Sequence, residues 1–207
     1  VMTYFDPKAT ISEQYKILRT NILSINKAKP PKVIAITSST HSEGKTVTAL
    51  NLAVVLAQST KKPKVLLVDA DLRRGKIARY LGVEQKTGLT EILRGEAEPN
   101  QLMFHLDAFD NLNFLTPGEV PENPAELVHS DKMRQFLTDV RMQYDHVIID
   151  TPPIISVTDP GLIGSLADGV IVVLQAGRTQ RGVLKRAIEL LEQAHCEILG
   201  YVLTHIE

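Results

Sequence analysis

The sequence predicts a three-layer α/β domain in which helices cover both faces of a mostly parallel central sheet. Short apolar runs alternate with amphipathic stretches along the chain, which is the pattern of strands joined by helices. Most of these runs are apolar at nearly every position, as expected for strands buried on both faces. The 207 residues, 43% of them apolar, are enough for one sizeable core, so we expect a single domain over residues 1–207.

The first expected element is an amphipathic helix that precedes the sheet. Thr-Ile-Ser-Glu at Thr10–Glu13 has the pattern of a capping box. Four apolar side chains then share one helical face: Ile11, Tyr15, Leu18 and Ile22. The segment Asn26–Pro31 ends this helix, and residues 1–30 are therefore expected to form a helical appendage to the sheet.

The remaining elements alternate between strand and helix. The expected strands are Val33–Thr37, Val65–Asp69, Leu112–Thr116, Val147–Asp150, Val170–Gln175 and Ile198–Leu203. The expected helices include Lys45–Ser59, Ala125–Val140 and Gln180–Ala194. The second helix has a marked start at Asn123–Glu126, with an Asn cap, a Pro at the first helical position and a Glu three residues after the cap.

Composition excludes several classes of protein. The formal net charge is -1 and the pI is about 6.7, so bulk electrostatics give no indication of a nucleic-acid partner. No apolar run approaches the roughly 20 residues of a membrane span, and no signal-peptide pattern is present. The single cysteine, Cys196, cannot form an internal disulfide, and we expect a buried structural thiol in a reducing, cytoplasmic setting.

The segment Ser38–Thr46, with the sequence SSTHSEGKT, follows an apolar run and precedes a helical pattern, as a phosphate-binding loop does. Glycine allows close approach of the backbone to phosphate, lysine reaches the β and γ phosphates, and the hydroxyl binds Mg²⁺. Because Ser39 stands where such loops usually open with glycine, an ordinary strand-to-helix turn is the alternative. The predicted nucleotide-binding residues are Ser42, Glu43, Gly44, Lys45, Thr46 and Val47.

Three acidic residues follow apolar runs directly. Asp69 and Asp71 end the second expected strand, and Asp150 ends the fourth. Ligands of open parallel sheets bind outside the carboxyl ends of the strands, so these carboxylates are expected to converge with the phosphate loop. A single aspartate at such a place is more often a solvated strand end or a helix cap, but three together favour a metal–nucleotide site.

Three segments resemble the Walker A, Walker A′ and Walker B motifs of the bacterial tyrosine kinases: SSTHSEGKT, VLLVDADLRR and VIIDTPP. These kinases are cytoplasmic domains that control capsule and exopolysaccharide synthesis, and they belong to the MinD/ParA-like group of P-loop ATPases. The similarity extends over nearly the whole chain. It implies a P-loop fold, ATP and Mg²⁺ as cofactors, and phosphoryl transfer to tyrosine.

One lysine separates the kinases from the partition ATPases. MinD and ParA proteins carry a second, signature lysine at the place of Thr40, and this chain lacks it. The Asp-x-Asp-x-Arg pattern of Asp69, Asp71 and Arg73 resembles the kinase version of Walker A′. We therefore favour a kinase; the alternatives are a MinD/ParA-like ATPase switch without kinase activity and a non-catalytic, nucleotide-sensing scaffold.

The resemblance also implies roles for individual residues. Lys45 stabilises the phosphates, and Thr46, Asp71 and Asp150 hold the metal. Asp69 is the candidate base for the tyrosine hydroxyl, while Arg73 orients the acids or contacts a neighbouring chain. Residue spacing leaves the division of roles between Asp69 and Asp71 open.

A further resemblance concerns assembly. The family's Glu-x-x-Arg-x-x-Arg motif corresponds to Glu13, Lys16 and Arg19, which implies contacts in a homo-oligomeric ring; a solvated charged stripe is the alternative. Expected partners are a transmembrane polysaccharide co-polymerase or activator, fused or separate, which holds the domain at the inner face of the membrane, and a cognate tyrosine phosphatase. The five tyrosines of this chain are scattered, so the tyrosine-rich tail that serves such kinases as substrate is expected either to lie outside this sequence or to be absent from the protein.

Overall fold

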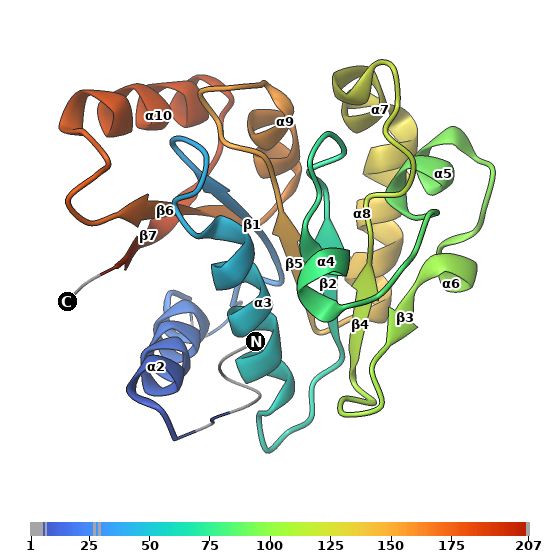
Figure 1. Ribbon diagram of the computed structural model, residues 1–207, viewed down its shortest axis with the longest axis horizontal. Coiled ribbons are helices and arrows are strands. Elements are labelled where there is room, and N and C mark those ends of the chain that lie inside the picture. Colours follow the sequence, from blue (N-terminus) through green and yellow to red (C-terminus); the bar gives the residue numbers. More distant parts are fainter. Residues whose placement is uncertain (1–5, 7, 27, 29, 206–207) are drawn as a thin grey trace.

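The sheet has the strand order β3-β4-β2-β5-β1-β6-β7 (Figure 1). The structure is a computed structural model that describes residues 6, 8–26, 28 and 30–205. Its strands are β1 (Val33–Ser38), β2 (Val65–Asp69), β3 (Phe104–His105), β4 (Leu112–Leu115), β5 (His146–Asp150), β6 (Gly169–Gln175) and β7 (Ile198–Thr204). Neighbouring strands are parallel except for β3 and β4. The predicted mostly parallel sheet is confirmed, and β3 is an addition to it.

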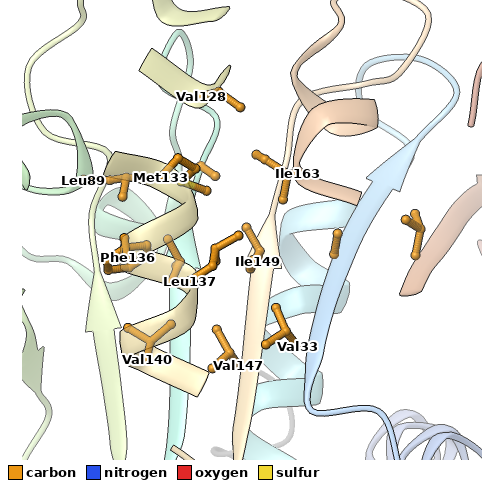
Figure 2. Packing of buried hydrophobic residues seen from close by; sticks show 14 of the residues in the cluster. Val33, Leu89, Val128, Met133, Phe136, Leu137, Val140, Val147, Ile149 and Ile163 are labelled. Carbon is orange, nitrogen blue, oxygen red and sulfur yellow. The ribbon is translucent and has the colours of Figure 1, made fainter. Parts of the chain in front are cut away.

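Helices cover both faces of this sheet. They are α2 (Thr10–Ser24), α3 (Lys45–Ala57), α4 (Ile77–Leu81), α5 (Leu89–Arg94), α6 (Pro99–Leu102), α7 (Pro124–His129), α8 (Asp131–Gln143), α9 (Asp159–Leu166) and α10 (Arg181–Gln193). Strand side chains alternate between two cores: Val33 and Ala35 face one, and Ile34 and Ile36 face the other. The first core includes side chains of α8 and β5 such as Phe136 and Ile149 (Figure 2). The three-layer fold is therefore confirmed.

Helix α2 packs on α3, on the face of the sheet opposite α8 (Figure 1). Tyr15 and Ile22 are buried there, but Ile11 is 44% exposed, so the predicted apolar face is shorter than expected. The Arg19 guanidinium donates to the backbone oxygen of Val55 in α3 over 2.6 Å. The helical appendage is thus attached to the sheet domain within its own chain; residues 1–5, 7, 27 and 29 of the predicted appendage lie outside the described residues.

Two predictions about helices are wrong, although α7 does begin after Asn123 with Pro124 in its first turn. The capping box at Thr10 is absent: Ala9 is the N-cap, and the Ser12 hydroxyl donates instead to the backbone oxygen of Asp6 over 2.6 Å. The single helix over Ala125–Val140 is two helices, because Ser130 adopts extended geometry and caps α8 by accepting from the Met133 amide. A chain that turns here can fit both helices against the same core.

Two other expectations concern the thiol and the membrane. Cys196 is partly buried with its sulfur 3.4 Å from the Gly161 oxygen, and burial raises the pKa of this thiol to about 11, in keeping with a structural role. Within the part of the chain that is described, no helix has the length and apolar character needed to cross a bilayer.

Asp168 joins three elements at the start of β6. Its carboxylate accepts from the amides of Lys32 and Val33 over 2.9 and 2.8 Å, and from Arg141 of α8 over 2.6 Å. Burial opposes ionisation, but these hydrogen bonds outweigh it and lower the pKa of Asp168 below 3.8.

We expect Asp168→Asn to lower the free energy of unfolding by about 1–3 kcal/mol at neutral pH, because one acceptor oxygen becomes a donor. Since the folded-state pKa is depressed, the stabilisation is present above pH 4 and is lost as pH falls through the folded-state value. Urea unfolding at pH 7 and pH 3 measures the free energy of unfolding of both proteins. The difference in this free energy between wild type and variant should be smaller at pH 3. If the free-energy difference is the same at both pH values, the ionised carboxylate of Asp168 is not the source of the stabilisation.

Candidate active site

The loop between β1 and α3 has the backbone shape of an anion-binding turn. Ser42 and Gly44 both have positive φ, 67° and 95°, on either side of Glu43. When residues with left-handed backbone flank a residue with ordinary backbone, their successive backbone N–H groups point toward one side and can surround an anion. Ser39 is fully buried, and its hydroxyl has no hydrogen-bond partner among the described residues. A small side chain therefore fits where the first glycine of such loops usually stands.

Gly44 lies against the end of β7. A β-carbon added to Gly44 would stand 3.2 Å from the methyl group of Thr204, and the Thr204 hydroxyl lies 2.9 Å from the backbone oxygen of Glu43. Thr204, the last residue of β7, thus supports the loop itself.

We expect Gly44→Ala to weaken ATP binding roughly tenfold or more, because alanine disfavours this left-handed backbone and would displace the loop. Titration calorimetry with ATP and Mg²⁺ measures it. Gly182→Ala in α10 is the matched control, since nothing lies within 4 Å of its added carbon. Equal ATP affinity of the two variants would show that the loop does not hold the nucleotide.

The basic and acidic residues predicted from the sequence meet at the carboxyl ends of β2 and β5. The Lys45 ammonium lies 3.4 Å from Asp71 Oδ2 and 3.5 Å from Asp150 Oδ1. The Thr46 hydroxyl donates to Asp150 Oδ2 over 2.6 Å. The register of the sheet pairs Asp69 with Asp150 directly. Val47, also predicted to touch the nucleotide, lies in the first turn of α3 and is 40% exposed.

Burial and charge perturb this cluster strongly. Burial alone would lower the pKa of Lys45, but the carboxylates of Asp150 and Asp71 outweigh it and raise that pKa. Burial, with a contribution from Asp150, raises the pKa of Asp69 from 3.8 to about 7. Burial also raises the pKa of Asp150, against the opposing effects of Lys45 and Thr46. Perturbed groups that gather in this way are typical of functional sites.

Asp69 and Asp71 have different surroundings. Asp69 is fully buried, and its Oδ2 accepts from the amides of Lys76 and Ile77 at the start of α4 over 2.8 and 2.9 Å. Asp71 is bonded to the Arg74 amide over 3.1 Å and keeps its other oxygen toward Lys45. Asp69 is therefore attached to the following segment, whereas Asp71 faces the phosphate loop.

Arg73 pairs with a residue that the sequence analysis missed. Its Nε lies 3.5 Å from Oδ2 of Asp159, a fully buried carboxylate at the start of α9 that makes no hydrogen bond within the described ranges. The sequence Asp159-Pro160 is typical of a helix start. Arg73 lies far away in the sequence, so no sequence motif could predict that the two residues form an ion pair.

The Glu43 side chain was also missed as a support of the loop. It is 1% exposed; its Oε2 accepts from the Thr40 amide over 2.8 Å, and its Oε1 accepts from the hydroxyl of Thr179. The carboxylate thus holds the loop closed and joins it to the segment before α10.

The oligomerisation residues lie apart from this cluster, on α2. Lys16 and Glu13 form an ion pair over 2.6 Å along the helix, and Arg19 bonds to α3 as described above. Their contacts with the chain itself leave the prediction of an intersubunit role untested.

The residues present fit a magnesium-bound nucleotide. Hydroxyl and carboxylate oxygens are the donors that Mg²⁺ prefers, and Thr46, Asp71 and Asp150 supply them. No group of three or more His, Cys, Asp or Glu side chains in the described chain has the arrangement of a complete metal site. Magnesium commonly takes one or two carboxylates and completes its shell with substrate phosphates and water, so a protein-only cluster is not required.

The fold and this site together define a P-loop protein of the nucleotide-binding α/β class. The sequence model of the AAA domain family matches residues 31–198. Tyrosine-protein kinase YwqD of Bacillus subtilis (strain 168) is 38% identical over 203 residues, which cover 98% of this chain and 84% of that protein. Putative tyrosine-protein kinase EpsB of Ralstonia nicotianae is 33% identical over 195 residues, but the chain spans only 26% of its length.

Solved structures of tyrosine kinases and of a related ATPase are similar to this chain as well. The kinase domain of Escherichia coli tyrosine kinase ETK superposes with a TM-score of 0.91 at 32% identity, covering 100% of this chain and 81% of that one. The cell division ATPase MinD of Pyrococcus furiosus gives a TM-score of 0.69 at 26% identity over 84% and 71% of the two chains. The chain belongs to the bacterial tyrosine-protein kinase family, which confirms the resemblance and does not favour the partition ATPases.

Proposed function

We propose that this chain transfers the γ-phosphoryl group of ATP to tyrosine hydroxyls, as part of the control of capsule or exopolysaccharide synthesis. The observation that carries the proposal is the convergence of Lys45, Thr46, Asp71 and Asp150 within hydrogen-bonding or ion-pair distance. Membership of the tyrosine-kinase family favours this activity over an ATPase switch.

Phosphoryl transfer depends mainly on positioning and on neutralising charge. Lys45 would hold the β and γ phosphates, the backbone of Ser42–Lys45 would surround them, and Thr46, Asp71 and Asp150 would hold Mg²⁺. Bound Mg²⁺ supplies further neutralisation of the phosphate charge.

The tyrosine hydroxyl is the acceptor of the phosphoryl group. A bond forms between the tyrosine oxygen and the γ phosphorus, the bond to the departing ADP oxygen breaks, and the tyrosine proton passes to a base. Asp69 is the proposed base, because a carboxyl group with a pKa near 7 can accept a proton at neutral pH. Arg73, oriented by Asp159, is the proposed positioning group for the acids or a neighbouring chain.

The setting of the reaction is part of the same proposal. A transmembrane activator would hold the domain at the inner face of the membrane, and a cognate tyrosine phosphatase would reverse the modification. Glu13, Lys16 and Arg19 would contribute to a homo-oligomeric ring, with Arg19 exchanging its present contact at Val55 for one across the interface.

Incubation with ATP, Mg²⁺ and a tyrosine-bearing peptide tests the activity. Phosphotyrosine that forms with time and requires all three components is the expected result. Release of phosphate without phosphotyrosine, with the peptide present in excess, would favour the ATPase switch instead.

A further inference from the structure

The segment that follows the second strand exposes positive charge beside the site. Residues 72–82 contain Arg73, Arg74, Lys76 and Arg79 and no acidic residue, in a chain whose formal net charge is -1. Arg73 is paired with Asp159. The side chains of Arg74, Lys76 and Arg79, which we term the cationic strip, are exposed and make no ion pair within the described part of the chain.

The geometry of α4 places two of these charges, one at its N-cap and one within it, on its solvent-facing side. Ile77 is fully buried, and Leu81 packs against the same core, so the opposite face of α4 is directed to solvent. Lys76 and Arg79, three residues apart, lie on that outward face together with Tyr80, which is 52% exposed. The strip therefore combines cations with an exposed aromatic ring.

The backbone of the strip is attached to the acids of the site. The Arg74 amide donates to Asp71 over 3.1 Å, and the Lys76 amide donates to Asp69 over 2.8 Å. These bonds set the strip in a defined position next to the carboxylates that the tyrosine hydroxyl must approach. A chain lying along the strip would therefore reach the site.

We propose that the cationic strip binds the acceptor polypeptide and selects tyrosines flanked by acidic residues. This inference rests on the proposed kinase function and names its substrate class. Exposed cations attract acidic side chains weakly and over several ångströms, which suits guidance of a peptide rather than the chemical step. The cation of the phosphate-binding loop is the buried Lys45, which pairs with Asp71 and Asp150 and makes no ion pair with the strip.

Two labelled peptides test the proposal, each with one tyrosine, flanked either by several glutamates or by several glutamines. Binding is measured by fluorescence anisotropy with phenylalanine in place of tyrosine, and phosphorylation is measured as kcat/KM with the tyrosine peptides. The wild type should prefer the acidic peptide roughly tenfold in both assays, and the preference should fall as salt is raised. The triple variant Arg74→Gln, Lys76→Gln, Arg79→Gln should lose this preference.

A matched triple variant, Lys132→Gln, Arg134→Gln, Lys185→Gln, removes the same charge from exposed positions on α8 and α10 and should keep the preference. Equal use of both peptides by the wild type would overturn the inference and leave the kinase function standing. Selective binding without phosphorylation would support the strip and count against the kinase function. If the strip variant loses binding to phosphatidylserine vesicles but keeps the peptide preference, the surface binds membrane and the inference is wrong.

Discussion

Replacing Lys45 by Met is expected to lower tyrosine phosphorylation at least about 100-fold, the scale of losing one preorganised charge on a transferred phosphoryl group. Lys45 is the cation that lies between Asp71 and Asp150, at 3.4 and 3.5 Å. Its removal withdraws the positive charge from the phosphates and leaves the two buried carboxylates without their cation. Phosphotyrosine detection with ATP, Mg²⁺ and the tyrosine peptide measures the loss.

Two controls separate chemistry from folding. Lys45→Arg keeps the charge beside the carboxylates but changes its shape and reach, so it should retain the fold and still lose most of the activity. Lys61→Met makes the same chemical change at an exposed position and should leave activity within about twofold, as surface substitutions usually do. If Lys45→Met has a wild-type melting temperature and undiminished phosphotyrosine, the assigned site is wrong.

The strands and the site could be predicted because each depends on strong, simple signals. A strand buried on both faces is a continuous apolar run, and β2 lies where it was expected, at Val65–Asp69. The carboxyl ends of parallel strands share one edge of the sheet, so Asp69 and Asp150 had to become neighbours once both strands were recognised.

The short elements carried no comparable signal. Strand β3 has two residues and α6 has four, too few for a periodic pattern to appear. The division between α7 and α8 had a signal, since Ser130 is followed by Asp131 in the manner of a helix start. The long amphipathic pattern on both sides of Ser130 concealed it.

Support of the site by distant residues could not be derived from spacing. Glu43 meets Thr179 across 136 positions of sequence, and Arg73 meets Asp159 although neither lies in the other's motif. Such pairs arise from tertiary packing, and a single sequence holds no record of them. The sequence therefore indicated the residues that converge at the site better than those that hold them in place.

The largest effect on stability is expected in the core between α8 and the sheet. Met133 of α8 is fully buried in the first core, which also includes Val128 of α7 and Ile163 of α9 (Figure 2). Met133→Ala should lower the free energy of unfolding by about 2–5 kcal/mol, because it removes apolar contacts and leaves a cavity that rigid neighbours cannot fill.

The same helix provides its own control. Met142 is 82% exposed, so Met142→Ala makes the identical change on α8 without emptying any space, and its effect should stay within about 0.5 kcal/mol. Both substitutions favour the helix slightly and equally, which removes intrinsic propensity from the comparison. Urea unfolding of the two variants isolates the packing contribution. Similar losses in both would mean that α8 does not pack against the sheet through the Met133 face, and the layer arrangement on that side would have to be revised.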